Sequence, residues 1–437
     1  MRLSSRLVFW TLPVSSLLWL GGEMTRAAPG DWPQFHGPNR DAVCTETGLL
    51  PSWPAAGPKL LWTLKGLGRG YSTIAIVAGK LYTMGDRTTA GTKEQMVQAY
   101  DLATRKQLWA TPIGPPHSGG GPRCTPTVDG NFLYAIGTDG DLACLATASG
   151  KLVWKKNFVA DFGGRMMCMR NGTVNWRFSE SPLVDGDKVL CTPGGPQATI
   201  VALDKHTGQT IWKCAVPKLG DRGGDGAGYS SMVAADIEGV RQYIQFFGRG
   251  VVGVEAATGR FLWGYNHVAN DVANISTPIV RGNFVFASAA YKAGSGLVKI
   301  TRDGDRFRAD EVYFLDSKTF SNHHGGVVLL GDCVYGGDGQ NSGAPTCIDF
   351  STGKVLWKER PLAKGSAAVL AADGNLIFRY DTGLVALIEA NPKAFKVKGS
   401  FQPSGKPSGP NWPHPVIHQK KLYLRDNDVL VCYDLAG

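Results

Sequence analysis

The sequence predicts an all-β protein built from eight repeated units, each a four-stranded antiparallel sheet. The clearest unit spans residues 201–212: an apolar run leads to Asp204, a Thr207-Gly208 turn follows, and Trp212 ends the second strand. An Asp that bonds turn amides and a Gly that supplies a positive φ are typical of a tight turn between strands. Similar units recur along the chain, and periods of forty to fifty residues made of short strands predict a β-propeller, in which each unit is one blade.

The aromatic residue that ends each unit sets the period. Trp109, Trp154, Trp212 and Trp263 are spaced by 45, 58 and 51 residues, and the gap of 94 residues before Trp357 fits two further units. Degenerate copies at residues 297–307 and 384–395 take the fifth and seventh places. We expect almost no helix, because 57 Gly and 25 Pro punctuate short strands throughout and no long amphipathic pattern occurs.

The two ends of the repeat region complete one another. Residues 60–64 read as the last strand of a unit whose first three strands are missing, and residues 414–417, 421–424 and 429–434 read as those three strands. Joining them removes the exposed edges that an open array would leave. The sequence therefore predicts an eight-bladed propeller over residues 59–437, with the ring closed by the amino-terminal strand in the last blade.

Residues 1–28 read as a signal peptide, and residues 29–58 as an ordered amino-terminal arm that lies on the propeller. Arg2 and Arg6 precede an apolar run over residues 7–20, and small residues follow at 25–28. The run is shorter than a spanning helix needs, so we expect no membrane span after cleavage. Cleavage changes the formal charge from +10 to +8. These features predict a periplasmic or secreted protein.

Composition restricts the possible partners and the redox chemistry. Basic residues are scattered, with nothing longer than pairs such as Lys155-Lys156, so we expect no nucleic-acid partner. Nine cysteines with no CxxC motif and no adjacent pair are most simply small buried thiols. Cys333 and Cys347 could instead face each other on neighbouring strands of one blade.

The repeated Asp-x-x-Thr-Gly-x-x-x-Trp units, the blade count and the shared last blade resemble the PQQ-like β-propellers, the superfamily of quinoprotein alcohol dehydrogenases and BamB. The resemblance covers about residues 59–437. The segments at 31–35 and 179–184 are similar to a BamB-like exported subgroup. The resemblance implies that the terminal Trp of each unit docks against the neighbouring blade.

Ligands of propellers bind where the loops leading into the innermost strands converge. From the eight loops we expect a binding mouth that suits a small planar or anionic ligand, with Arg123, Arg177, Tyr229, Lys364 and Trp412 as its binding residues. Further candidates in the same loops are Arg69, Tyr71, Trp176, Asn322 and His414.

The resemblance also implies a possible catalytic centre. Quinoprotein dehydrogenases hold Ca²⁺ beside the quinone with a Glu and an Asn, and Glu180 and Asn274 stand at comparable positions. His323 and His324 lead into the sixth blade and are the candidate catalytic residues, because a His can act as a general base near neutral pH. The sequence departs from that pattern, since it has no adjacent cysteines and no Asp before the sixth blade. Glu180 could equally cap the strand turn or pair with Arg177, and Asn274 could equally satisfy loop amides.

Two functions follow from these observations. The first is an exported propeller that acts as a binding or scaffold module for a protein or cell-envelope partner, without catalysis. The alternative is a PQQ- and calcium-dependent quinoprotein oxidoreductase that acts on an alcohol or sugar. The missing dehydrogenase features favour the first.

Overall fold

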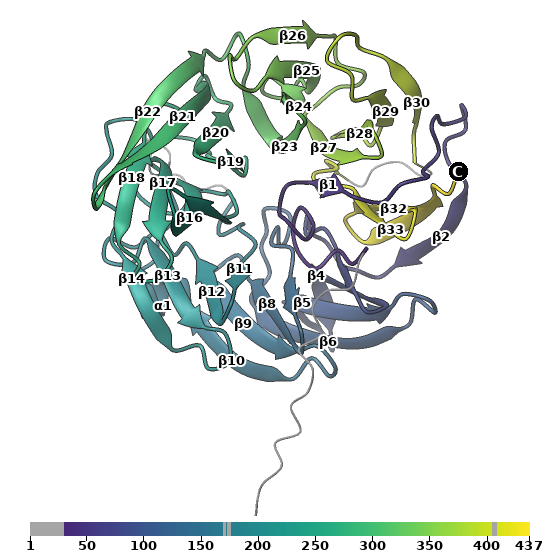
Figure 1. Cartoon of the computed structure of the whole chain (residues 1–437). Helices are drawn as coiled ribbons and strands as arrows, with labels where there is room; N and C mark the ends of the chain where they lie inside the picture. The colour runs from purple at the N-terminus through teal and green to yellow at the C-terminus, as the bar shows by residue number, and fades with distance from the viewer. Residues whose placement is uncertain (1–29, 169–171, 173–175, 404–408) are drawn as a thin grey trace, which may run out of the picture.

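The computed structural model describes residues 30–168, 172, 176–403 and 409–437. Eight sheets stand around a common centre, as Figure 1 shows. Seven sheets have four strands each and the eighth has a fifth strand, and the one helix among the described residues is α1 (Phe158–Phe162). The prediction of an eight-bladed, almost helix-free propeller is confirmed. The predicted signal peptide, residues 1–28, lies outside the described residues.

Each blade runs from an innermost to an outermost strand. Blade 1 is β3 (Ala75–Val77), β4 (Lys80–Thr89), β5 (Thr92–Asp101) and β6 (Gln107–Gly114); blade 2 is β7 (Thr127–Asp129), β8 (Phe132–Ile136), β9 (Asp141–Ala146) and β10 (Leu152–Asn157); blade 3 is β11 (Leu183–Asp185), β12 (Lys188–Cys191), β13 (Ile200–Asp204) and β14 (Thr210–Cys214); blade 4 is β15 (Val233–Ile237), β16 (Val240–Phe247), β17 (Gly250–Glu255) and β18 (Phe261–Tyr265).

The other half of the ring has the same order. Blade 5 is β19 (Ile279–Arg281), β20 (Phe284–Ala289), β21 (Gly294–Asp303) and β22 (Arg306–Leu315); blade 6 is β23 (Asn322–Leu330), β24 (Cys333–Asp338), β25 (Ala344–Asp349) and β26 (Val355–Lys358); blade 7 is β27 (Ala367–Ala372), β28 (Asn375–Tyr380), β29 (Val385–Glu389) and β30 (Val397–Phe401); blade 8 is β31 (Val416–His418), β32 (Lys421–Asp426), β33 (Val429–Asp434) and β2 (Leu60–Lys65).

The ring closes as the sequence predicts. Strand β2 pairs with β33 in antiparallel fashion, with Trp62 opposite Cys432 and Thr63 opposite Val431. The first strand of the repeat region thus completes the last blade (Figure 1), and side chains of blades 8 and 1 share one buried cluster.

The aromatic residues that end the units bind the blades to one another. The indole Nε1 of Trp109, Trp154, Trp212 and Trp357 donates to a backbone carbonyl of the next blade, at Thr147, Lys205, Ala256 and Asn391 respectively, over 2.8 to 3.2 Å. Trp263 differs, because its Nε1 donates to Gln242 of its own blade at 2.8 Å. The hydrogen bond across blades is made at these four positions, and Trp263 lies in one buried cluster with Val285 and Val298 of blade 5.

The fifth unit extends beyond the predicted residues 297–307. Strands β21 and β22 are each ten residues long, so the hairpin turn lies far out and the docking position shifts to Tyr313. Tyr313 stands opposite Leu297, and its hydroxyl donates to the carbonyl of Phe350 in blade 6 at 2.9 Å. A tyrosine here takes the place that tryptophan holds in other blades.

The amino-terminal arm lies against the inner strands of several blades. Trp32 exchanges two backbone hydrogen bonds of 2.8 Å with Ile76 of blade 1, and the carbonyl of Pro33 accepts from Val128 of blade 2. Strand β1 (Val43–Cys44) pairs in parallel with β27 of blade 7. In Figure 1 this purple segment crosses the middle of the ring. The arm therefore covers one end of the space that the blades enclose.

Two fully buried arginines link neighbouring blades where the ring closes: Arg425 links blade 8 to blade 1, and Arg379 links blade 7 to blade 8. Arg425 of β32 donates to the carbonyls of Ser72, Met84 and Gly68 and to the hydroxyl of Thr83, all at 2.5 to 3.2 Å. Arg379 of β28 donates to the carbonyls of Pro413 and Arg425 and to the Asn411 side chain. Burial lowers the pKa of each guanidinium to about 10, so both remain charged at neutral pH.

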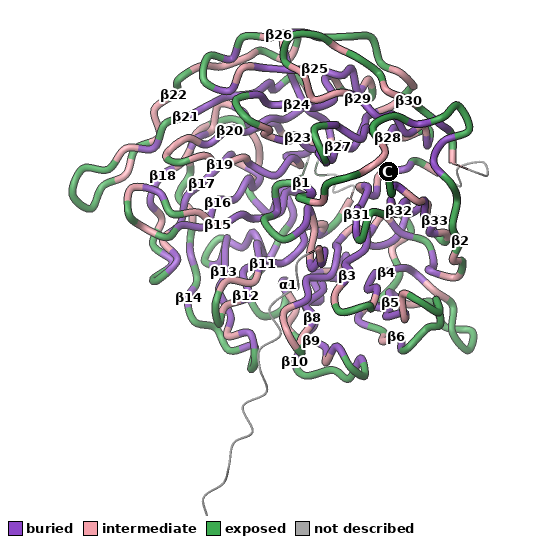
Figure 2. Tube along the Cα trace, turned by 45° about the vertical axis from the view of Figure 1, so that its right-hand side comes forward, coloured by how far each residue is buried: buried purple, intermediate pink, exposed green. Residues whose placement is uncertain are grey.

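The core lies on the inner and middle strands, and exposure rises toward the outer hairpins, as Figure 2 shows. Eight of the nine cysteines are buried free thiols, in agreement with the sequence, and Cys168 is exposed. Cys333 and Cys347 lie on the neighbouring strands β24 and β25 as free thiols. In the described part of the chain, none of the helical structure has the length and apolarity to cross a membrane.

Candidate functional site: an aromatic mouth at the centre of the ring

A cavity of about 150 Å³ lies where the loops leading into the innermost strands converge. We call it the mouth cavity. Its wall has six aromatic side chains of Phe, Tyr or Trp, four imidazoles, one arginine and several hydroxyl groups. The ring-bearing and charged wall residues are Phe35, His36, Tyr71, Arg123, Trp176, Tyr229, Tyr291, His323, His324, Trp412 and His414.

The rings of the wall contact one another in series. Tyr71 and Trp412 lie 4.5 Å apart between ring centroids, Trp412 and His324 5.2 Å, and His324 and His323 4.5 Å. Tyr291 continues the series at 5.1 Å from His323. Offset and edge-to-face contacts of this kind stabilise ring pairs, so the loops hold a preformed apolar wall.

Two further rings of the wall form a second contact pair. Trp176 and Tyr229 meet edge to face, with their centroids 5.6 Å apart. These two residues precede the innermost strands of blades 3 and 4, while Tyr71 and Trp412 precede those of blades 1 and 8. The wall is thus assembled from loops that are far apart in the sequence.

Arg123 brings a positive charge to this wall. Its guanidinium donates three hydrogen bonds, to the carbonyls of Gly119, Gly121 and Trp176 at 2.9 to 3.2 Å. It also lies 5.3 Å from the ring centre of Tyr71 and 5.8 Å from that of Trp412, within cation–π range. Burial lowers the pKa of Arg123 to about 10, and the group stays charged at neutral pH.

The imidazoles form two hydrogen-bonded groups. His36 Nε2 lies 3.1 Å from His414 Nδ1, and His323 lies between Tyr291 Oη, at 2.8 Å, and Ser366 Oγ, at 2.7 Å. Burial lowers the pKa of His323 to about 3 and that of His414 to about 4, and it holds the pKa of His36 well below its ordinary value. These three rings are therefore neutral at pH 7.

The fourth imidazole faces an acid. His324 Nε2 stands 3.6 Å from Asp381 Oδ1, and its ring lies between His323 and Trp412. The two candidate catalytic residues from the sequence, His323 and His324, therefore both line the mouth cavity, with different partners. Their role as catalytic residues stays a prediction.

Of the five predicted binding residues, the structure brings together Arg123, Tyr229 and Trp412. The other two do not line the mouth cavity. Arg177 is exposed and pairs with Asp139 at 3.1 Å, and Lys364 is exposed on the loop before blade 7. A residue that precedes an innermost strand is predicted to lie near the centre of the ring. The direction of its side chain, however, depends on the local backbone. Arg177 has a φ of 58°, which turns the chain at this point.

Glu180 lies below the wall and is fully buried. Its carboxylate accepts from the backbone N–H of Thr192 at 2.5 Å and from Gln245 Nε2 at 3.2 Å. Burial raises its pKa to about 7, and the positive charge of Arg40 opposes that rise. Arg40 itself donates to the carbonyls of Ser181 and Pro182, at 2.7 and 2.9 Å. Glu180 thus joins blades 3 and 4 beneath the arm.

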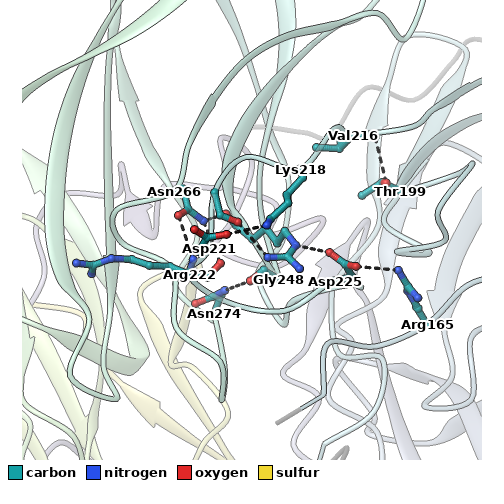
Figure 3. Close-up of polar contacts among 12 residues, drawn as sticks. Arg165, Thr199, Val216, Lys218, Asp221, Arg222, Asp225, Gly248, Asn266 and Asn274 are labelled. Carbon is teal, nitrogen blue, oxygen red and sulfur yellow. Dashed lines mark hydrogen bonds and ion pairs between the residues drawn. The ribbon is translucent and has the colours of Figure 1, made fainter. Parts of the chain in front are cut away.

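Asn274 is also buried, and it bonds the backbone. Its Nδ2 donates to the carbonyls of Phe247 and Gly248 at 3.0 Å each, and its Oδ1 accepts from Asn270. Figure 3 shows the Asn274 amide directed at Gly248, and it shows separate contacts between Asn266 and Arg222. Both hydrogen-bonding ends of this side chain are in use.

The residues present do not fit the calcium-bound quinone that the resemblance implies. Glu180 and Asn274 direct their oxygens to protein groups, and neither lines the mouth cavity. A cavity of about 150 Å³ is the size that holds one benzene ring, which is smaller than a fused tricyclic quinone. Across the described ranges, no group of three or more His, Cys, Asp or Glu could hold a metal ion. The assignment of Glu180 and Asn274 as metal ligands stays a prediction.

Three of the ring-bearing wall residues were not predicted from the sequence. Phe35 and His36 come from the arm, and their rings stack with centroids 3.8 Å apart. Tyr291 comes from the turn between β20 and β21, which opens on the same face as the loops into the inner strands because antiparallel strands alternate in direction. Tyr291 has a φ of 54°, a conformation that a bulky residue rarely adopts. The aromatic residues of the arm were a sequence signal that could have pointed to Phe35 and His36, whereas no sequence signal pointed to Tyr291.

The closed ring of eight sheets defines an eight-bladed β-propeller. The sequence model of one family, described as outer membrane protein assembly factor BamB, matches residues 93–359, which is more than half of the chain. The chain belongs to this BamB family.

Relatives agree with this assignment. The outer membrane protein assembly factor BamB of Burkholderia pseudomallei is 26% identical over 381 residues, covering 79% of this chain and 92% of the relative. The solved structure of BamB from Moraxella catarrhalis has a TM-score of 0.60 and 14% identity, covering 86% of this chain and 99% of that one. Quinohemoprotein alcohol dehydrogenase from Comamonas testosteroni shares the fold, with a TM-score of 0.62, 12% identity, and 94% and 81% of the two chains covered.

Proposed function

We propose that this chain is an exported binding or scaffold propeller of the cell envelope, which holds a protein partner there. The observation that carries the proposal is the family match over residues 93–359, together with a relative whose name describes assembly of outer membrane proteins. A ring closed by β2 and β33 suits this role, because it presents fixed loops without an open sheet edge at the junction. The proposed location is the periplasm or the exterior of the cell, after removal of residues 1–28.

Co-purification from the envelope tests this proposal. The full chain is produced in its native host with a tag after Gly437, an exposed residue, and the envelope fraction is cross-linked, solubilised and purified. We expect one envelope protein to be recovered in fixed stoichiometry, and the recovered chain to begin near residue 29. An unrelated exported protein with the same tag is the control. Recovery of the chain without such a protein contradicts the proposal.

A quinoprotein oxidoreductase is the alternative, and the fold shared with quinohemoprotein alcohol dehydrogenase is the observation that favours it. Titration of the purified chain with PQQ and Ca²⁺ tests it independently. Saturable quinone absorbance with dye reduction by an alcohol or sugar supports the enzyme, and its loss in Glu180→Gln supports Glu180 as a ligand. No binding at high micromolar PQQ rejects this alternative.

A further inference from the structure

We propose that the mouth cavity binds a single aromatic ring that carries a carboxylate, with Arg123 holding the carboxylate and the surrounding rings holding the ligand ring. The site belongs to the isolated chain, so it does not depend on the proposed envelope partner. The substrate class is a small monocyclic aromatic acid.

The charge of the wall supports an anionic group. Among the wall residues that the structure describes, Arg123 is the one Lys or Arg, and no Asp or Glu is present. The three hydrogen bonds that Arg123 donates all go to neutral carbonyls. A guanidinium has five N–H donors, so two remain for a ligand. A buried charge is stabilised when it is paired, and a carboxylate accepts from a guanidinium in a planar, two-point geometry.

The neutral imidazoles strengthen this assignment. His36, His323 and His414 each have a pKa well below neutral pH, and their nearest partners are a second histidine, Tyr291 and Ser366. They add flat surface without charge. His324 faces Asp381, which lies behind it and outside the cavity wall. The attraction for an anion therefore centres on one side of the mouth cavity, at Arg123.

The size and lining of the mouth cavity support one ring. An apolar cavity of about 150 Å³ is large enough for benzene. Tyr71 and Trp412 lie directly against Arg123, at 5.3 and 5.8 Å from its guanidinium. A ligand whose carboxylate reaches Arg123 places its own ring beside these two, where edge-to-face and offset contacts are favourable.

Fluorine NMR titration of the purified chain, without residues 1–28, tests the proposal with 4-fluorobenzoate. We expect saturable line broadening. The neutral molecule 4-fluorobenzyl alcohol, which has the same ring and a similar size, should bind about tenfold more weakly or worse, as for the loss of one charge-assisted hydrogen bond. Cyclohexanecarboxylate should compete poorly, because it lacks the aromatic ring.

Two arginine variants locate the site. Arg123→Gln should weaken 4-fluorobenzoate binding about tenfold or more. Arg177→Gln is the matched control: this exposed arginine lies on a neighbouring loop and pairs with Asp139 instead of lining the cavity, so binding should not change. If Arg123→Gln does not fold, two other measurements decide whether Arg123 holds the carboxylate. One is the wild-type comparison of 4-fluorobenzoate with 4-fluorobenzyl alcohol, and the other is the affinity of Arg123→Lys, which keeps the charge.

The outcomes are distinct. Saturable binding that needs both the carboxylate and Arg123 supports the site. Three results overturn it: no saturable broadening at millimolar 4-fluorobenzoate, equal binding of the acid and the alcohol, or equal loss in the Arg123 and Arg177 variants. None of these results bears on whether an envelope protein co-purifies with the chain.

Discussion

The indole of Trp154 lies on the backbone of Gly208 in the next blade, and its Nε1 donates to the Lys205 carbonyl at 2.9 Å. A Cβ added at Gly208 would stand 2.7 Å from Trp154 Cδ2. Gly208 also has a φ of 71°. The glycine and the tryptophan of successive units are therefore two halves of one contact between blades, and this contact explains why the pair recurs in the sequence.

Gly208→Ala should destabilise the protein by about 2 to 4 kcal/mol, because a left-handed alanine costs roughly 1–2 kcal/mol and the clash adds a similar amount. Urea unfolding followed by tryptophan fluorescence measures the change. The variant should lose less stability in a Trp154→Ala background, where the clash is absent.

Gly186→Ala is the matched control for this prediction. Gly186 has a φ of 59°, and an added Cβ would meet nothing within 4 Å. Gly186→Ala should therefore lower the free energy of unfolding by only the cost of the left-handed backbone, about 1 to 2 kcal/mol. Equal losses at Gly186 and Gly208 would mean that the contact with Trp154 contributes nothing.

Arg425→Met should destabilise the junction between blades 8 and 1. It leaves the carbonyls of Ser72, Met84 and Gly68 without this donor, and an unsatisfied buried group costs about 1–3 kcal/mol. We expect a total loss of about 3 kcal/mol or more in urea unfolding, with faster proteolysis. Arg308→Met, at a residue whose side chain is 76% exposed and pairs within its own blade, should change stability by less than about 0.5 kcal/mol. A loss at Arg425 no larger than at Arg308 would contradict the proposed link.

The fold was predictable because the contact between blades requires specific residues at a fixed spacing. Where another residue makes that contact, the pattern in the sequence disappears. Tyr313 replaces tryptophan in blade 5, beyond the predicted end of that unit. In blade 7 the arm residue Trp53 packs on Gly399, which stands opposite Leu387. The ring was therefore predictable as a whole, although the details of these two blades were not.

His414 should make the folded state sensitive to acid. Burial lowers its pKa to about 4, whereas the unfolded chain has a histidine near 6.5. Between these values the unfolded state binds a proton that the folded state does not, so stability is lost as the pH falls through this window. His414→Gln should reduce the slope of unfolding free energy against pH by up to about 1.4 kcal/mol per pH unit. An unchanged slope between pH 6.5 and 4 would exclude this contribution.

Glu180 should have the opposite effect on the pH dependence of stability: it should make the folded state less stable as the pH rises. Burial raises its pKa to about 7 from 4.5, so the folded state keeps a proton that the unfolded state releases. Its contribution to stability therefore falls as the pH rises from 4.5 to 7. Glu180→Gln removes this titration, and the variant should gain stability relative to wild type across that window in urea unfolding. A difference that does not vary with pH would show that the carboxyl is ionised in both states.

The candidate site was predictable in part. Arg123, Tyr229, His323, His324 and Trp412 were found because each precedes or begins an innermost strand, and such positions converge in a closed ring. The same rule placed Glu180 and Asn274 near the centre, but their side chains bond blades 3 to 5 together below the wall. Spacing along the chain locates a loop, whereas the direction of a side chain depends on backbone angles and on neighbours from other blades.

The native mass of the chain in a gently solubilised envelope tests the central claim most directly. Size-exclusion chromatography with light scattering, on tagged chain from its own host, should give a complex heavier than one chain, with a single envelope protein in fixed proportion. A mass equal to that of one chain, with no second protein, would contradict the scaffold function.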